Sequence, residues 1–345
     1  MTAQNGPLLS VRDLKTYFMM DEGVVKAVDG VSFEVRAGQT FGIVGESGCG
    51  KSVTIKSILR IVEPPGKIVH GQILLRRTHE DGAADQGELN LVGLDPYGPE
   101  IRRIRGGQIA LIPQEPMSSF SPVHTIGNQI IEAIMLHQSI GKQAARTLAH
   151  DILRDVGVPM PERRLDEYSW QLSGGLRQRA IIAMALSCNP RLLIADEPTT
   201  AVDVTTQAQV LRLLRELQQE HNSAIIFITH DLGVIAQMAK FVMVMYLGLV
   251  MEQGPVDDIF HGAKHPYTQA LLRSIPSVSS QSRVALPTIS GSIPHPFNKP
   301  KGCPFHPRCT KHMPGKCDVR TPALEGVGDT QQVSCFLYHD VEVSE

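Results

Sequence analysis

The segment from Gly45 to Ser52 has the residue types and spacing needed to hold nucleotide phosphates. It reads Gly-Glu-Ser-Gly-Cys-Gly-Lys-Ser and matches the pattern G-x-x-x-x-G-K-[ST] in full. An apolar run, Thr40 to Val44, precedes it and a helical pattern follows, so backbone N–H groups and a helix N-terminus can surround an anion. Lys51 is expected to reach the β and γ phosphates and Ser52 to ligate magnesium. A glycine turn that only caps a helix is the alternative, and the flanking patterns disfavour it.

Nine loop residues are expected to contact the nucleotide: Gly45, Glu46, Ser47, Gly48, Cys49, Gly50, Lys51, Ser52 and Val53. A second candidate is the apolar run Leu192 to Ala195, which ends in Asp196 and Glu197. In such a pair Asp196 would hold magnesium and Glu197 would act as the base that polarises the attacking water. A strand that ends in two acids is by itself more often an exposed strand terminus, but the phosphate loop reverses that preference.

A third segment, Leu172 to Gln178, reads Leu-Ser-Gly-Gly-Leu-Arg-Gln and opens a helix. Ser173, Gly174 and Gly175 would present a hydroxyl and N–H groups to an anion. This segment resembles the signature of ABC-type ATPases. Four further marks of that family follow the expected order: an adenine-stacking aromatic at Phe18 (less favoured, Tyr17), the Q-loop Gln114, the D-loop Val202-Asp203 and the switch residue His230. Taken singly, each has a structural explanation.

The resemblance implies a mechanism as well as a fold. Gln114 would bind magnesium and sense the phosphate, His230 would stabilise the γ phosphate, and Glu197 would orient water. The chain has one phosphate loop and one signature, whereas sites of the family hold ATP between the loop of one domain and the signature of another. The resemblance therefore implies a dimer with a second ATPase subunit, with Ser173, Gly174, Gly175 and Asp203 facing the partner's nucleotide.

Four of the six cysteines lie in the last part of the chain, at Cys303, Cys309, Cys317 and Cys335. Their dispersed spacing lacks the C-x-x-C pairs of zinc ribbons, so a [4Fe-4S] cluster is favoured over zinc, with four free thiols as the alternative. Cys49 and Cys188 are expected to be packing residues.

Two motifs, His265 to Thr268 and Gly302 to Cys309, resemble the C-terminal extension of dipeptide and oligopeptide importer ATPases, which can carry an iron–sulfur cluster. The cations around these cysteines are expected to form a solvated face, with lipid head groups or a partner as alternative contacts. They are Lys299, Lys301, Arg308, Lys311 and Lys316.

The pattern of elements predicts an α/β fold, an ABC-type P-loop ATPase core with an antiparallel β layer, an inserted helical subdomain and a small Cys-rich C-terminal extension. Strands are expected at 11–18, 31–35, 40–44, 192–195 and 224–229, and helices at 51–61, 178–188, 205–220 and 268–274. The expected domains are an ATPase domain at 8–260, with its helical subdomain at about 115–190, a helix and linker at 261–300, and the extension at 301–345. The polar stretch 76–88 is expected to be a loop excursion.

The formal net charge of -2 gives no global attraction to nucleic acid, and the apolar stretch 241–251 is too short to span a bilayer. No export signal is recognised at the N-terminus. These features favour a cytoplasmic protein without nucleic acid as partner. The resemblance to importer ATPases implies a place on the cytoplasmic face of the inner membrane, bound through two integral permease subunits and working with an extracytoplasmic peptide-binding protein. The alternatives are an importer of nickel or another small solute and a soluble ABC ATPase acting on nucleic acid or ribosomes.

Overall fold

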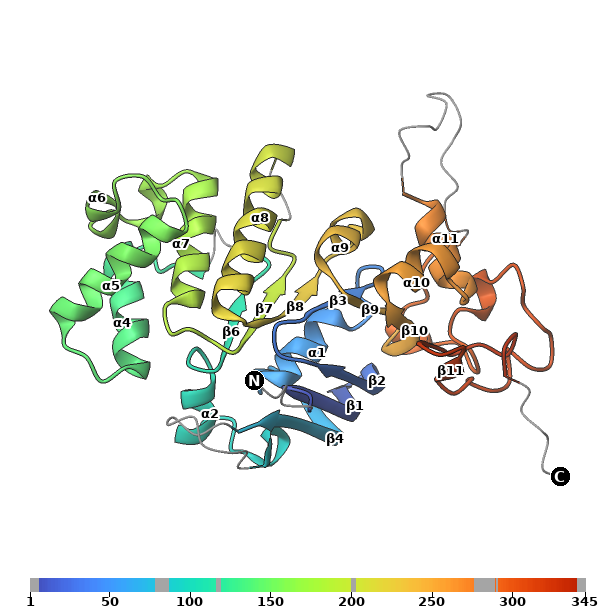
Figure 1. Ribbon diagram of the computed structural model, residues 1–345. Helices are drawn as coiled ribbons and strands as arrows, with labels where there is room; N and C mark the ends of the chain where they lie inside the picture. The colour runs from blue at the N-terminus through green and yellow to red at the C-terminus, as the bar shows by residue number, and fades with distance from the viewer. Residues whose placement is uncertain are drawn as a thin grey trace. The chain divides into compact units, whose positions relative to one another are not determined.

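The computed structural model describes residues 6–77, 87–115, 119–199, 203–275, 289 and 291–339 (Figure 1). The chain divides into two compact units, and each is built from separate stretches. The first unit is drawn from residues 1–8, 35–40 and 93–228, and the second from 9–34, 41–92 and 229–345. Residue 202 and most of the expected excursion at 76–88 lie outside the described residues.

The first unit contains three parallel strands whose residues are almost entirely buried. They are β6 (Ile109–Ile112), β7 (Leu192–Asp196) and β8 (Ala224–Ile228), with β7 paired to both neighbours. Continuous apolar runs of this kind are typical of parallel strands covered on both faces. Helix α8 (Val204–His221) follows β7 along the chain and buries Val210, Leu214 and Leu217, the residues whose helical spacing predicted it.

A group of helices in the same unit lies between β6 and β7 in sequence, drawn in green in Figure 1. They are α4 (Ile126–His137), α5 (Lys142–Asp155), α6 (Pro161–Leu165) and α7 (Gly174–Leu186), and a short α2 (Pro99–Ile104) precedes β6. Helix α4 packs against α5, α6 and α7. Its inward face carries Ile130, Ile131 and Ile134, all buried, as their spacing predicts. Gly141 is the N-cap of α5, so a new helix begins there after α4.

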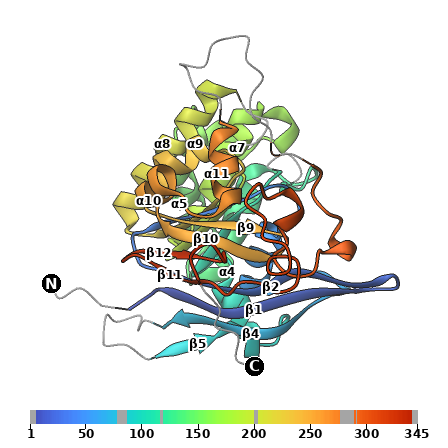
Figure 2. The same ribbon diagram turned by 90° about the vertical axis from the view of Figure 1, so that its right-hand side faces the viewer.

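The second unit begins with an antiparallel sheet in the order β2-β1-β4-β5 (Figure 2). Its strands are β1 (Leu9–Met20), β2 (Gly23–Val35), β4 (Gly66–Arg76) and β5 (Glu88–Asn90). The predicted antiparallel start of the chain is therefore confirmed. The expected excursion at 76–88 connects β4 to β5.

Strand β3 (Thr40–Val44) pairs in parallel with β9 (Phe241–Tyr246), and β9 pairs with β10 (Leu249–Pro255) across a tight turn at Leu247 and Gly248. The C-terminal residues then add β12 (Gln331–Val333) to β10 and β11 (Glu325–Val327) to β12. The sequence pattern predicts no strands in this extension, because three-residue strands leave no periodic pattern.

The described residues of the second unit also form four α-helices: α1 (Lys51–Ile58), α9 (Leu232–Met238), α10 (Val256–Gly262) and α11 (Pro266–Arg273). Among the described residues, none of the helices has both the length and the apolar character that crossing a lipid bilayer requires.

Candidate nucleotide-binding site

The phosphate loop occupies the turn between β3 and α1 in the second unit, and its backbone requires glycine at two positions. Gly50 has φ +106°, and a Cβ there would overlap the carbonyl oxygen of Ala27. A Cβ on Gly45 would likewise overlap the carbonyl oxygen of Met245. At both glycines a neighbouring backbone carbonyl lies so close to Cα that there is no room for a side chain. The loop shape is therefore set by this unit's own packing.

Lys51 folds back over this loop. Its ammonium donates hydrogen bonds to the carbonyl oxygens of Gly45 at 2.7 Å and Glu46 at 3.1 Å, and the residue is only 6% exposed. The first turn of helix α1 is stabilised because Thr54 donates both its N–H and its hydroxyl to the carbonyl of Gly50. The lysine is thus held inside the loop, where a triphosphate would be expected to compete for its protons.

The remaining loop residues divide by exposure. Ser47 and Gly48 are exposed, Ser52 and Val53 are half-buried, and Cys49 is 3% exposed. Burial raises the pKa of the Cys49 thiol, so it stays protonated and acts as a packing residue beneath the loop. Cys188 in the first unit is half-buried, and burial raises the pKa of its thiol too.

The two predicted carboxylates lie at the end of β7 in the first unit. Asp196 is 7% exposed, and Glu197 turns away with φ +48° while its N–H donates to the Ile228 carbonyl at 2.9 Å. The side-chain amide of Gln114 donates to Oε2 of Glu197 at 3.3 Å. The structure thus brings together two predicted site residues that are far apart in sequence.

The signature segment forms the exposed start of α7. Ser173 is the N-cap, and its hydroxyl accepts the N–H of Leu176 at 3.4 Å. The buried side chain of Gln178 donates to the carbonyl of Pro198, which ties this helix to the loop after Glu197. Asp203 caps the next helix, α8, by accepting the N–H and hydroxyl of Thr206 at 2.9 and 2.7 Å. Those hydrogen bonds lower the pKa of the Asp203 carboxyl.

Two further predicted residues belong to the second unit. His230 is exposed and directly precedes α9, whose N-cap Asp231 accepts two backbone N–H groups. Phe18 is half-buried near the end of β1, whereas the neighbouring Tyr17 donates its hydroxyl to Asp29 at 2.6 Å. Adjacent strand residues face opposite sides of a sheet, so Phe18 does not share the surroundings of Tyr17. Its stacking role stays a prediction.

The four C-terminal cysteines converge on one cavity in the second unit. Cys303, Cys309, Cys317 and Cys335 line one small cavity with Phe305 and Phe336. Burial raises the pKa of Cys303 to about 12 and also raises the pKa of Cys309 and Cys335, so these thiols are neutral. Among the described residues, no three His, Cys, Asp or Glu side chains are arranged to hold a metal ion. Metals bind thiolates, so ligation here would require these thiols to lose their protons. The expected iron–sulfur or zinc ligation stays a prediction.

Residues 28–200 match the family described as ABC transporter, and residues 251–317 match the oligopeptide/dipeptide transporter C-terminal region. This chain belongs to the ATP-binding subunits of the dipeptide and oligopeptide ABC transporters. For this ABC subunit, ATP is the expected ligand of the phosphate loop.

Similar proteins extend along almost the whole ABC subunit. The oligopeptide transport ATP-binding protein AppD of Bacillus subtilis is 46% identical over 96% of this chain and 97% of its own. The dipeptide transport ATP-binding protein DppD of Escherichia coli is 43% identical over 95% and 96%. A probable peptide ABC transporter ATP-binding protein of Sinorhizobium fredii, y4tR, is 44% identical over 99% of each chain.

Solved structures share the fold at lower identity. The ATP-binding cassette MJ0796, in a dimeric structure bound to ADP and Pi, is 24% identical with a TM-score of 0.61, over 72% of this chain and 98% of its own. The protein cbiO1 from Clostridium perfringens is 23% identical with a TM-score of 0.58, over 74% and 91%. These similarities confirm the predicted ABC-type P-loop fold.

Sequence reasoning missed two residues that touch the phosphate loop. The hydroxyl of Tyr267 accepts the N–H of Glu46 at 3.0 Å, and the guanidinium of Arg308 donates to the Glu46 carboxylate. The sequence places Tyr267 only within the motif His265 to Thr268, which gives no sign of its contact with the phosphate loop. Arg308 was assigned to a solvated basic face, and that assignment is wrong because its side chain is 5% exposed.

Proposed function

We propose that this ABC subunit binds and hydrolyses MgATP to power import of dipeptides or oligopeptides. The observation that carries the proposal is that one chain matches both the ABC transporter family and the peptide-transporter C-terminal region, and resembles peptide transport proteins over nearly its full length. Its partners would be a second ATPase subunit, two integral permeases and an extracytoplasmic peptide-binding protein. It would then lie peripherally on the cytoplasmic face of the inner membrane.

Each site residue has a proposed role. Lys51 and the loop N–H groups would bind the phosphates, and Phe18 would stack on adenine. Ser52, Asp196 and Gln114 would hold magnesium, which when bound neutralises phosphate charge. Glu197 would accept a proton from the attacking water, and His230 would stabilise charge on the γ phosphate. The hydrogen bond between Gln114 and Glu197 supports a shared location for two of these roles in the first unit.

The signature would act on a nucleotide held by a second subunit. Ser173 and Gly174 are exposed at the start of α7, where N–H groups and the helix dipole favour an anion. With ATP present, the γ phosphate would attract this helix start, and hydrolysis would remove that attraction. Asp203, at the start of α8, would face the same junction.

For the four C-terminal cysteines we retain a [4Fe-4S] cluster as the proposed ligand, with zinc as the alternative. The support is that all four line one cavity, and a cluster is wider than a single ion. Deprotonation of the thiols would have to accompany binding. Iron and zinc analysis of anaerobically purified protein decides between them, and Cys309→Ser should abolish the bound metal.

Replacing Glu197 with Gln tests the proposed reaction. The variant should bind MgATP like the wild type but hydrolyse it about a thousandfold more slowly, because water loses its base. It should also accumulate as ATP-bound dimers in size-exclusion chromatography. The same variant, reconstituted with the permeases, should fail to import a labelled dipeptide. Unchanged hydrolysis would remove Glu197 from the mechanism.

A further inference from the structure

We infer that Arg308 of the C-terminal extension is a positioning residue for nucleotide binding, which acts by holding and neutralising Glu46 inside the phosphate loop. The inference rests on the proposed function, in that the loop must bind MgATP. It concerns only the second unit, which contains both the loop and the extension.

The contact between Arg308 and Glu46 is a two-pronged ion pair. Nη1 donates to Oε2 at 2.8 Å and Nη2 donates to Oε1 at 3.0 Å. Nη1 also donates to the Tyr246 hydroxyl at 3.2 Å, and the guanidinium lies 5.8 Å from that ring and 6.0 Å from the ring of Phe305. The arginine is buried by these aromatic rings, so the pair is screened less by water than a surface pair. Parallel hydrogen bonds of this kind fix geometry as well as charge.

A second contact, from helix α11 ahead of the extension, holds the backbone of Glu46. Buried Glu252 on β10 accepts the N–H groups of Lys264 at 2.7 Å and His265 at 3.0 Å. His265 is the N-cap of α11, and its Nδ1 accepts the N–H of Tyr267 at 3.0 Å. The Tyr267 hydroxyl then accepts the N–H of Glu46. The His-Pro-Tyr motif thus positions the Tyr267 hydroxyl against the backbone of the phosphate loop.

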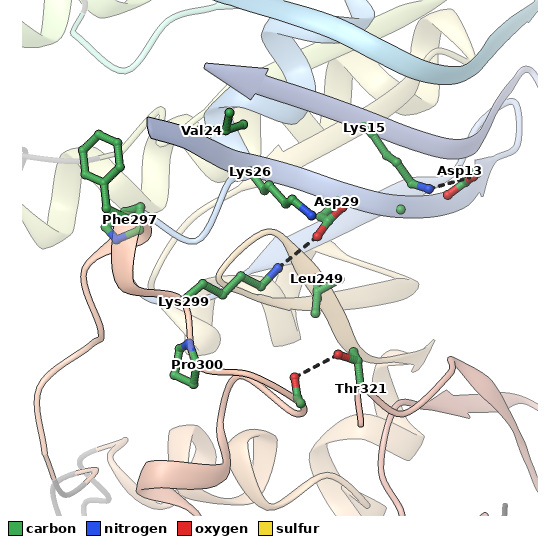
Figure 3. A pocket seen from close by; sticks show the side chains of 13 residues that line it. Asp13, Lys15, Val24, Lys26, Asp29, Leu249, Phe297, Lys299, Pro300 and Thr321 are labelled. Atoms are coloured by element: carbon green, nitrogen blue, oxygen red, sulfur yellow. Dashed lines mark hydrogen bonds and ion pairs between the residues drawn. The ribbon is translucent and has the colours of Figure 1, made fainter. Parts of the chain in front are cut away.

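The linker that precedes the extension contacts β2, the strand next to the one that carries the proposed adenine-stacking residue. In the pocket of Figure 3, Lys299 points toward Asp29 on β2 and pairs with it at 3.2 Å. Asp29 also accepts the hydroxyl of Tyr17, the neighbour of Phe18. This contact involves no loop residue, so Lys299 provides a comparison with Arg308.

The charge balance explains why Arg308 would matter for nucleotide. Glu46 is part of the loop that is to receive a polyanion, and its carboxylate is 21% exposed. Without Arg308 the carboxylate of Glu46 would repel the triphosphate. Arg308 therefore removes a penalty that Glu46 would otherwise impose on binding.

The test is MgATP affinity, measured by calorimetry on the full chain for a set of variants. Arg308→Met should weaken binding about tenfold, because it leaves a carboxylate unpaired in the loop. Adding Glu46→Gln to it should restore affinity to within about threefold of wild type, since the repulsion is gone. The defect of Arg308→Met should shrink in high salt. Arg320→Met removes an exposed charge from the same extension and should change affinity less than about twofold.

The outcomes separate the hypotheses. Wild-type protein that fails to bind MgATP overturns the proposed function and this inference together. Wild-type binding with equal affinity in Arg308→Met overturns the inference alone. A defect that the double variant does not relieve also overturns it, because loss of folding rather than charge would be responsible. Should Arg308→Met fail to fold, Arg308→Gln gives the same test, because it removes the charge but can still donate one hydrogen bond to Glu46. Wild-type affinity in that variant contradicts the inference.

Discussion

The phosphate loop and the signature segment are both glycine-containing starts of helices, yet their glycines have different causes. In the phosphate loop, side chains at Gly45 and Gly50 would collide with backbone carbonyls of the same unit. At the start of α7, a Cβ on Gly174 would meet no atom within 4 Å, and one on Gly175 would meet only Thr206 at an ordinary 3.7 Å. Neither signature glycine has a positive φ. The fold of this chain therefore requires the first pair of glycines and not the second.

The difference indicates where each segment finds its ligand. The loop is shaped from within, so it can be formed before a nucleotide arrives. The signature glycines leave open space above an exposed helix start, which suits close approach by something outside this chain. This agrees with the proposal that a second subunit brings the nucleotide to the signature.

The largest effect should follow from removing the loop's cation. Lys51→Ala should weaken MgATP binding by about a hundredfold or more, because the buried ammonium is the loop's charged donor to the phosphates. Calorimetry measures the loss, and thermal unfolding shows whether the fold persists. Lys56→Ala is the matched control, since Lys56 is exposed on the same helix. Equal affinity in Lys51→Ala and Lys56→Ala would mean that the loop does not bind phosphate.

The two glycine classes can be separated directly by alanine substitution. Gly50→Ala should lower the free energy of unfolding by about 2 kcal/mol, because alanine is strained at this φ and collides with Ala27. Gly174→Ala should change it by less than about 0.5 kcal/mol. It should instead slow ATP hydrolysis by the assembled transporter about tenfold, by holding the helix start away from the phosphate. Urea unfolding and steady-state turnover measure these; equal destabilisation by both substitutions would erase the distinction.

The smallest effect concerns the cap of α8. Hydrogen bonds from Thr206 lower the pKa of Asp203 below its ordinary value of 3.8, so the carboxylate stabilises the folded chain above that pH and loses this contribution as pH falls through the lowered pKa. Asp203→Ala should therefore reduce the melting temperature slightly at pH 7 and progressively less in acid. Asp203→Asn, which can still cap, is the control. A difference that is independent of pH would contradict this assignment.

Local sequence predicted those features that local physics determines. Strands such as Leu192–Asp196 are continuous apolar runs. The phosphate loop is a short motif that needs glycine because a Cβ would collide with nearby backbone atoms. Helix ends were less accurate: α7 begins at Gly174, earlier than the expected 178, because the N-cap Ser173 rather than the apolar pattern sets its start.

Contacts between distant residues could not be predicted in this way. Nothing in the sequence near Gln114 indicates that its amide meets Glu197. Arg308 lies among cations and prolines, a composition typical of a solvated tail. Its burial is made favourable by distant residues, the carboxylate of Glu46 and the aromatic rings of Tyr246 and Phe305. For the four C-terminal cysteines, the proposed cluster already required the sulfurs to converge, and they line one cavity. The raised pKa of the Cys303 thiol could not be predicted, because it depends on burial that sequence spacing does not reveal.

The hydrogen bond from Glu46 to Tyr267 joins residues 221 positions apart, which constrains how such subunits can be recombined. A shortened ATPase that stops near residue 260 would lose the acceptor for this N–H and uncover the ring of Tyr246. A chimera that borrows its tail from another importer would need a compatible residue at position 46. The phosphate loop and the C-terminal residues from Tyr267 onward should thus be exchanged together.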